Sequence, residues 1–111
     1  MKITNGQIVA ALNMIDGLKK DNRHLPIRLS YALNKNQNIL YELYKPYEAT
    51  LKTIDQEKDK DAVLALLSEE NEVELHKVTL ETLESAYLSI NEMEIIQTFM
   101  MEEPDDSNHP N

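Results

Sequence analysis

Few residues of this sequence combine the types and spacing that catalysis or metal binding requires. A catalytic nucleophile needs a base within hydrogen-bond reach and usually a third group that orients that base. The three histidines, His24, His76 and His109, are spread along the chain, and their spacing indicates no shared site. Glu74 and His76 stand two residues apart and would share one face of a strand. That gives two metal ligands at most, and an exposed polar face is the simpler interpretation.

Other signatures of chemistry are missing from the sequence. The chain has no cysteine, which excludes disulfides, thiolate zinc sites and cysteine nucleophiles. It has neither a His-Glu-x-x-His motif nor a glycine-rich phosphate loop. Carboxylate pairs such as Glu69 with Glu70 are expected on an acidic surface without catalysis. The sequence therefore predicts a protein that is not an enzyme and that holds no metal or cofactor.

Length and net charge limit the remaining classes of protein. A chain of 111 residues has the length of one domain. A net charge of -9 disfavours direct contact with nucleic acid or an anionic membrane, since both are polyanions. No apolar run approaches the roughly 18–20 residues that span a bilayer, and the first residues lack the apolar stretch of a signal peptide. We expect a soluble protein of the cell interior.

The charge is divided unevenly along the chain. Residues 1–60 carry eight Lys and two Arg against seven acidic residues, a net of +3, whereas residues 61–111 carry Lys77 alone against 13 acidic residues, a net of -12. A solvated surface that keeps a small protein soluble explains this division. Two sharper alternatives are head-to-tail self-association and an acidic face that docks on a basic partner. Composition leaves all three open.

Capping signals and apolar spacing predict two helices in the first half. Thr4 and Gln7 form a capping box, which opens a helix over about residues 5–20. Pro26 favours the start of a second helix, which we expect to run over about residues 27–57. Pro46 lies inside it, and because the apolar stripe continues in phase beyond Pro46, a kink is preferred to a break.

The second helix carries a heptad-like apolar seam that is interrupted by Asn36 and Thr50. Packing against residues 5–20 as a helical hairpin explains this seam. The alternative is a partly intermolecular seam in which Asn36 fixes the register. The seam consists of Leu29, Leu33, Asn36, Leu40, Leu43, Tyr47, Thr50 and Ile54.

The second half of the chain predicts shorter elements. Residues 55–61 form a charged connector, and Asp61 is expected to cap a short helix that contains residues 62–67. Polar and apolar residues alternate over residues 72–78, which makes this stretch the best candidate for a strand. A lone strand leaves its backbone groups unpaired. It therefore needs residues 1–4, a second copy of itself or the edge of a partner.

Capping residues also predict the last two elements. Thr79 is expected to begin a turn or short helix that reaches Glu84. Ser89 and Glu92 form a second capping box, which opens a helix over about residues 90–102.

The C-terminal residues set the boundary of the domain. Residues 102–111 are acidic and contain two prolines, so we expect a disordered tail, with a single helix-rich domain over residues 1–101. Met101 is expected to be exposed. Together the elements predict a mainly α fold, namely a helical hairpin with a long kinked second helix, a minor β-strand and a short C-terminal helix.

Two groups of side chains are candidates for binding a partner. Tyrosine offers a rigid apolar body with a polar tip, which interfaces favour, although three tyrosines on the second helix would equally cover the rim of the core. Glutamates of the acidic half form the other group. The tyrosines are Tyr41, Tyr44 and Tyr47, and the glutamates are Glu69, Glu70, Glu72 and Glu74.

Two motifs of this sequence resemble a family of small proteins of unknown function from bacteriophages and prophages of Gram-positive bacteria. They are Thr-Asn-Gly-Gln at residues 4–7 and Leu-Pro-Ile-Arg-Leu-Ser-Tyr at residues 25–31. Val-Glu-Leu at residues 73–75 and the helix over residues 89–100 are similar to later parts of that family. The resemblance covers residues 2–101, with a shorter middle segment and a longer acidic tail. It implies a phage origin and action in the infected bacterium or the virion, and it supplies no catalytic residue.

These observations favour non-catalytic protein binding by a phage accessory protein. Its acidic C-terminal half would occupy the basic, nucleic-acid-facing surface of a host defence or replication enzyme in the bacterial cytoplasm. The partner would then be a host or phage protein. The alternative is a virion structural or assembly protein that self-associates into a homo-oligomer through the second helix.

Overall fold

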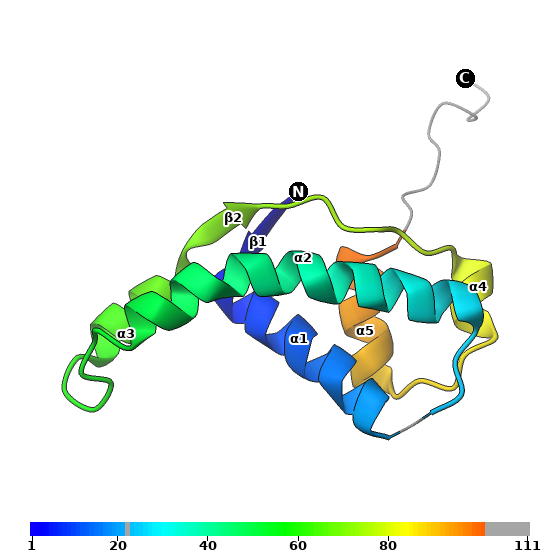
Figure 1. Ribbon diagram of the computed structural model, residues 1–111, viewed down its shortest axis with the longest axis horizontal. Coiled ribbons are helices and arrows are strands. Elements are labelled where there is room, and N and C mark those ends of the chain that lie inside the picture. Colours follow the sequence, from blue (N-terminus) through cyan, green and yellow to red (C-terminus); the bar gives the residue numbers. More distant parts are fainter. Residues whose placement is uncertain (22, 102–111) are drawn as a thin grey trace.

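A long central helix organises the molecule in the computed structural model, which describes residues 1–21 and 23–101 (Figure 1). Helices α1 and α5 lie along one side of α2, and α3 and α4 lie near its two ends (Figure 1). The prediction of a mainly α fold with a minor β element is confirmed. In chain order the elements are β1 Lys2–Thr4, α1 Asn5–Lys20, α2 Ile27–Leu51, α3 Lys60–Ser68, β2 Glu70–Glu72, α4 Leu80–Glu84 and α5 Ile90–Phe99.

The predicted hairpin of α1 and α2 is present and forms most of the core. The Thr4 hydroxyl accepts a hydrogen bond from the Gln7 backbone at 3.1 Å, and the Gln7 side chain accepts one from the Thr4 backbone at 2.8 Å, which confirms the capping box. The seam of α2 is covered within the chain, because its residues join the apolar face of α1 in one buried cluster. The buried seam residues are Leu29, Leu33, Asn36, Leu40 and Tyr47.

Helix α2 ends six residues earlier than predicted, at Leu51 instead of about Glu57. It continues through Pro46, as the in-phase stripe indicated. Thr53 ends the helix, because its backbone N–H and its hydroxyl both donate to the Thr50 carbonyl, at 2.9 and 2.7 Å. Asp55 then accepts from the backbone of the next residues of the connector. Such local side-chain bonds compete with the helical ones.

Helix α3 begins two positions before the prediction, at Lys60. Its cap is Asp59 and not Asp61, since Asp59 Oδ1 accepts from the Ala62 backbone N–H at 3.1 Å. Asp61 instead lies in the first turn, where a carboxylate is favoured by the helix dipole.

The predicted strand over residues 72–78 is wrong in extent. The ladder is β2 (Glu70–Glu72), which pairs antiparallel with β1, so that Ile3 faces Asn71. This pairing is one of the three partners that the sequence left open. Residues 73–78 have no neighbouring strand, although Val73, Leu75 and Val78 are buried as the alternation indicated.

The stretch after β2, residues 73–78, is held by side chains and isolated bonds. The buried Asn36 donates from Nδ2 to the His76 carbonyl at 2.9 Å and accepts the His76 N–H at 2.6 Å. One amide side chain thus satisfies both backbone groups of His76, as a neighbouring strand would. At the far end, the Val78 N–H donates to the Met100 carbonyl at 2.7 Å.

A second amide pair joins four elements near the start of the chain. The buried Asn5 donates from Nδ2 to the Leu66 carbonyl at 2.8 Å. Its Oδ1 accepts from Asn71 Nδ2 at 3.0 Å, and Asn71 also donates to the Ile3 carbonyl at 3.3 Å. This network fixes α1, α3 and the two strands relative to one another.

The last two helices begin as predicted; α4 also ends as predicted, at Glu84, whereas α5 ends early. Thr79 caps α4, and the Ser89–Glu92 capping box opens α5. Helix α5 ends at Phe99 and not near residue 102, because Met100 leaves the helical conformation and its carbonyl pairs with Val78. Met101 is half-buried, and the prediction that it is exposed is wrong, because a parallel bridge joins it to Val78. The tail predicted over residues 102–111 lies outside the described residues.

Glu92 gives the fold a testable pH dependence. Desolvation by burial acts to raise the pKa of Glu92, but hydrogen bonds from Ser89 and Arg23 outweigh it and lower the pKa below its usual 4.5. The Arg23 guanidinium lies 2.6 Å from Glu92 Oε1. A carboxylate with a lowered pKa stabilises the fold above its unfolded pKa, and this contribution is lost as pH falls through the folded pKa.

We therefore expect the Glu92→Gln variant to lose less stability than the parent chain on acidification from neutral pH to about pH 3. The measurement is urea denaturation at a series of pH values. Glu94→Gln, at an exposed position of the same helix, is the control and should retain the parent's pH slope. Equal slopes for the parent and Glu92→Gln would contradict the assignment.

Candidate binding surfaces

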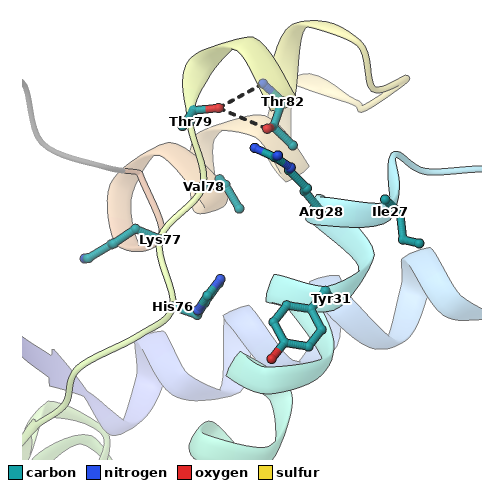
Figure 2. A pocket seen from close by; sticks show the side chains of 8 residues that line it. All are labelled: Ile27, Arg28, Tyr31, His76, Lys77, Val78, Thr79 and Thr82. Carbon is teal, nitrogen blue, oxygen red and sulfur yellow. Dashed lines mark hydrogen bonds between the residues drawn. The ribbon is translucent and has the colours of Figure 1, made fainter.

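A groove lies between the start of α2 and the chain that runs from His76 into α4 (Figure 2). Its volume is about 470 Å³. We call it the basic groove, because Arg28, His76 and Lys77 are among its lining residues. The lining residues are Ile27, Arg28, Tyr31, His76, Lys77, Val78, Thr79 and Thr82.

Tyr31 and Ile27 give the basic groove apolar surface that water reaches. The exposed fraction is 55% for Tyr31 and 85% for Ile27. The His76 ring packs edge-on against Tyr31, with 5.5 Å between the ring centroids. On the same ring, the Lys35 ammonium lies 5.3 Å from the centroid, within the range of a cation–π interaction.

The polar side chains of the basic groove differ in what they can offer a ligand. Thr79 and Thr82 bond to each other at 3.0 Å, and Thr79 also caps α4. Lys77 points away from the groove in Figure 2 and donates to the Phe99 carbonyl at 3.3 Å. Arg28 extends across the groove towards Thr82 (Figure 2) and takes part in none of the ion pairs of the described residues. Its guanidinium is therefore the group best placed to receive an anion.

Acidic surface is also present close by. A shallower hollow adjoins the basic groove, shares Ile27 and Arg28 with it, and includes the Glu81 side chain. Arg28 thus gives the α2 side of the basic groove a positive charge, whereas Glu81, in the first turn of α4, gives the adjoining hollow a negative one.

The predicted glutamates lie on a different part of the surface. Glu70, Glu72 and Glu74 are all exposed, whereas the residues between them, Asn71 and Val73, are half-buried or buried. We call these three glutamates the acidic ridge. Figure 1 shows that β2 and the extended chain after it run along one outer edge of the molecule. Glu69, at the end of α3, is exposed just before the ridge.

The three predicted tyrosines form a row along α2. Tyr41 is exposed, Tyr44 is half-buried and Tyr47 is buried. Their ring centroids are 6.5 Å apart for Tyr41 and Tyr44 and 5.7 Å for Tyr44 and Tyr47. Desolvation, followed by the nearby Glu48 carboxylate, raises the pKa of Tyr44. No hydrogen bond or ion pair of the described residues joins this row to the acidic ridge, so the structure does not merge the two groups into one site.

Glu74 and His76, the two possible metal ligands of the sequence, are joined by no third ligand among the described residues. Glu74 and His76 are both exposed on the same extended segment. Within residues 1–21 and 23–101, no three His, Asp or Glu side chains gather closely enough to hold a metal ion. In the same part of the chain, no helix has the length and apolar character needed to cross a bilayer.

No protein-family model, curated protein or solved structure matches the chain. The phage family that the two sequence motifs resemble therefore stays an expectation, and what the protein does must be argued from its surfaces.

The sequence contained only part of the signal for these surfaces. The acidic ridge follows from the alternation of residues 72–78, which is local. The basic groove combines Arg28 and Tyr31 with His76, more than forty positions away, and only the docking of residues 73–78 on Asn36 brings them together. Lys77 is the single basic residue of the acidic half of the sequence. It was the one sign in the sequence that this half contributes to the basic groove.

Proposed function

We propose that the protein is a phage-encoded, non-catalytic accessory protein that acts in the host cytoplasm by binding a protein. Its acidic ridge would contact the basic, nucleic-acid-facing surface of a host defence or nucleic-acid-handling enzyme. The supporting observation is that the ridge glutamates project from a backbone that the free protein already holds in place.

Three contacts hold that backbone. The β1–β2 ladder pairs Glu70 and Glu72 with residues of β1. Just beyond it, the Val73 N–H donates to the Met1 carbonyl at 2.9 Å. The Asn36 side chain then fixes His76. Because this segment is ordered before binding, a partner would not have to supply the free energy of ordering it.

The spacing of the carboxylates suits a basic surface. Alternate residues of an extended chain lie about 6.5–7 Å apart, so the ridge presents a row of carboxylates on one face, the middle one of which, Glu72, lies 3.4 Å from the Met1 ammonium. Proteins that bind nucleic acid neutralise a comparable row of phosphates with Lys and Arg. A fixed row of carboxylates would compete for those cations and would speed encounter through electrostatic steering.

The alternative, a virion protein that self-associates through α2, draws less support from the described residues. Its seam would have to be open to a second copy. Leu29, Leu33 and Leu40 are already buried against the chain's own α1 and its neighbours.

Neutralising the acidic ridge should weaken capture of the partner. We expect Glu70→Gln/Glu72→Gln/Glu74→Gln to bind about tenfold or more weakly, roughly 1.4 kcal/mol. The measurement is affinity capture from the phage's host, followed by titration of the captured protein with each variant. Raised salt should weaken the interaction because exposed charges are screened, and duplex DNA should displace the protein.

A control with the same change in net charge is Glu57→Gln/Glu84→Gln/Glu94→Gln, three exposed positions away from the ridge. It should bind like the parent chain. Equal loss in both triple variants, or capture that salt and DNA leave unchanged, would contradict the proposal. Detection of the protein in purified virions by mass spectrometry would favour the alternative.

A further inference from the structure

We propose that the free edge of β2 binds an extended segment of a partner protein, as an added antiparallel strand with Lys or Arg at alternate positions. This inference rests on the proposed function and deepens it, because it names the form in which a basic partner meets the acidic ridge. The hydrogen-bond pattern of the β1–β2 ladder and the row of glutamates along β2 both point to it.

The ladder between β1 and β2 fixes which backbone groups of β2 are paired. In an antiparallel ladder, residue pairs that exchange backbone hydrogen bonds alternate with pairs whose N–H and C=O groups point away from the partner strand. The Asn5 N–H donates to the Glu69 carbonyl at 3.0 Å, and the Val73 N–H donates to the Met1 carbonyl at 2.9 Å. Between Glu69 and Val73, the residue in the same phase is Asn71, so the backbone of Asn71 faces β1.

Glu70 and Glu72 are in the opposite phase, so their backbone N–H and C=O groups point to the other edge of β2. Among the described residues, the sheet consists of β1 and β2 alone, and no hydrogen bond reaches these backbone groups from that edge. The backbone of His76, further along the chain, is already satisfied by the Asn36 side chain. The free edge therefore covers about residues 70–74.

This edge is accessible and is held in place before binding. It lies along the outside of the molecule (Figure 1), and β1 fixes the strand from the opposite side. A free strand edge is a template for another extended chain. In such strand addition, main-chain hydrogen bonds supply the affinity and alternate side chains supply the specificity.

The acidic ridge determines which strand the free edge accepts. In antiparallel neighbours, side chains directly opposite each other lie about 4.5–5.5 Å apart at Cβ, where opposite charges stabilise and like charges destabilise the pair. A strand with Lys or Arg at alternate positions would set one cation against each of Glu70, Glu72 and Glu74. Glu72 remains 71% exposed beside the Met1 ammonium. Two copies of β2 would instead set glutamate against glutamate, which disfavours a second copy as the occupant.

Synthetic peptides test this proposal on the full chain. The probe is acetyl-Thr-Lys-Thr-Lys-Thr-Lys-amide, compared with the same peptide N-methylated either on its lysines or on its threonines. With the lysines opposite the acidic ridge, the lysine N–H groups face β2 and the threonine N–H groups face away. We expect the lysine-methylated peptide to bind about tenfold or more weakly than the threonine-methylated one in an NMR titration.

Hydrogen exchange provides the readout on the protein. The unmethylated peptide should slow exchange of the Glu70 and Glu72 amides by about fivefold or more, because these N–H groups gain acceptors. The Asn71 amide, which already faces β1, should change little.

Two substitutions at one position separate the edge from the charge. Glu72→Pro and Glu72→Gln remove the same carboxylate, but only proline removes the N–H on the free edge, where an edge strand tolerates it. Glu72→Pro should therefore bind the unmethylated peptide about tenfold more weakly than Glu72→Gln. The methylated peptides decide the question on the parent chain if Glu72→Pro loses its fold.

Several results would overturn strand addition. They are no binding of the unmethylated peptide, equal or reversed affinities of the methylated ones, and unchanged Glu70 and Glu72 exchange in the bound state. Slowed exchange of these amides in the free protein at rising concentration would identify a second copy as the occupant and would also overturn it. Failure of the proposed function is a different result, namely host capture that the triple glutamine variant of the ridge does not weaken.

Discussion

Replacing Asn36 with alanine is expected to lower the free energy of unfolding by about 3 kcal/mol. The Asn36 side chain is fully buried, with an exposed fraction of 0%. Its two hydrogen bonds, at 2.9 and 2.6 Å, satisfy the carbonyl and the N–H of His76. Alanine would leave both backbone groups without these partners, and a buried polar group that loses its partner costs about 1–3 kcal/mol.

Urea denaturation of a small set of variants measures this effect. Asn36→Asp has the same size and keeps the acceptor, but it faces the His76 carbonyl with an oxygen and buries a charge, so it should be at least as unstable as Asn36→Ala. Asn38→Ala, at an exposed position of the same helix, is the control and should stay within about 0.5 kcal/mol of the parent. An Asn36→Ala variant as stable as this control would show that residues 73–78 do not depend on the hydrogen bonds from Asn36.

The same variant connects stability with the proposed function. Residues 73–78 carry the end of the acidic ridge and one wall of the basic groove. Loss of the Asn36 contact should therefore increase hydrogen exchange at the His76 amide and weaken partner capture as well.

Replacing Leu83 with alanine is expected to cost about 3 kcal/mol, within the 2–5 kcal/mol range of buried leucines. Leu83 has an exposed fraction of 1% and is the buried residue of α4. A helix of five residues has little stability of its own, so this one side chain fixes α4 against the core. Without it, the Thr79 and Thr82 side of the basic groove should lose its order.

Leu80 gives a matched control in the same helix. Its exposed fraction is 52%, so Leu80→Ala should change stability by no more than about 0.5 kcal/mol. Thermal unfolding measures the two variants, and hydrogen exchange at the α4 amides reports whether the helix has loosened. Similar losses for Leu80→Ala and Leu83→Ala would contradict the packing described here.

Helix starts could be predicted from the sequence because their signals are local. Thr4, Ser89 and Thr79 cap the helices that they were expected to cap, since a cap needs only the next three residues. Helix ends were less accurate. Thr53 ends α2 with its own hydroxyl, and Met100 ends α5 because Val78, far away in the sequence, takes its carbonyl.

Asn36 shows why the tertiary role of a polar residue was missed. In the sequence it interrupts an apolar seam, which suggested either a hairpin or a register-setting contact between copies. Its partner is a backbone forty residues later, and no pattern around Asn36 points there. The basic groove was hidden for the same reason, because its two sides are joined only through that contact.

Both β1 and Met101 attach to the same extended stretch, at residues 70–72 and at Val78. This arrangement sets an order for the nascent protein on the ribosome. The α1–α2 hairpin can form early, but the buried cluster that it shares with Val73, Leu75 and Val78 is complete only after those residues have emerged and docked. Residues 100 and 101 then bind that stretch at its other end, so these contacts form only after residue 101 has been translated, at the usual 5–20 residues per second or so.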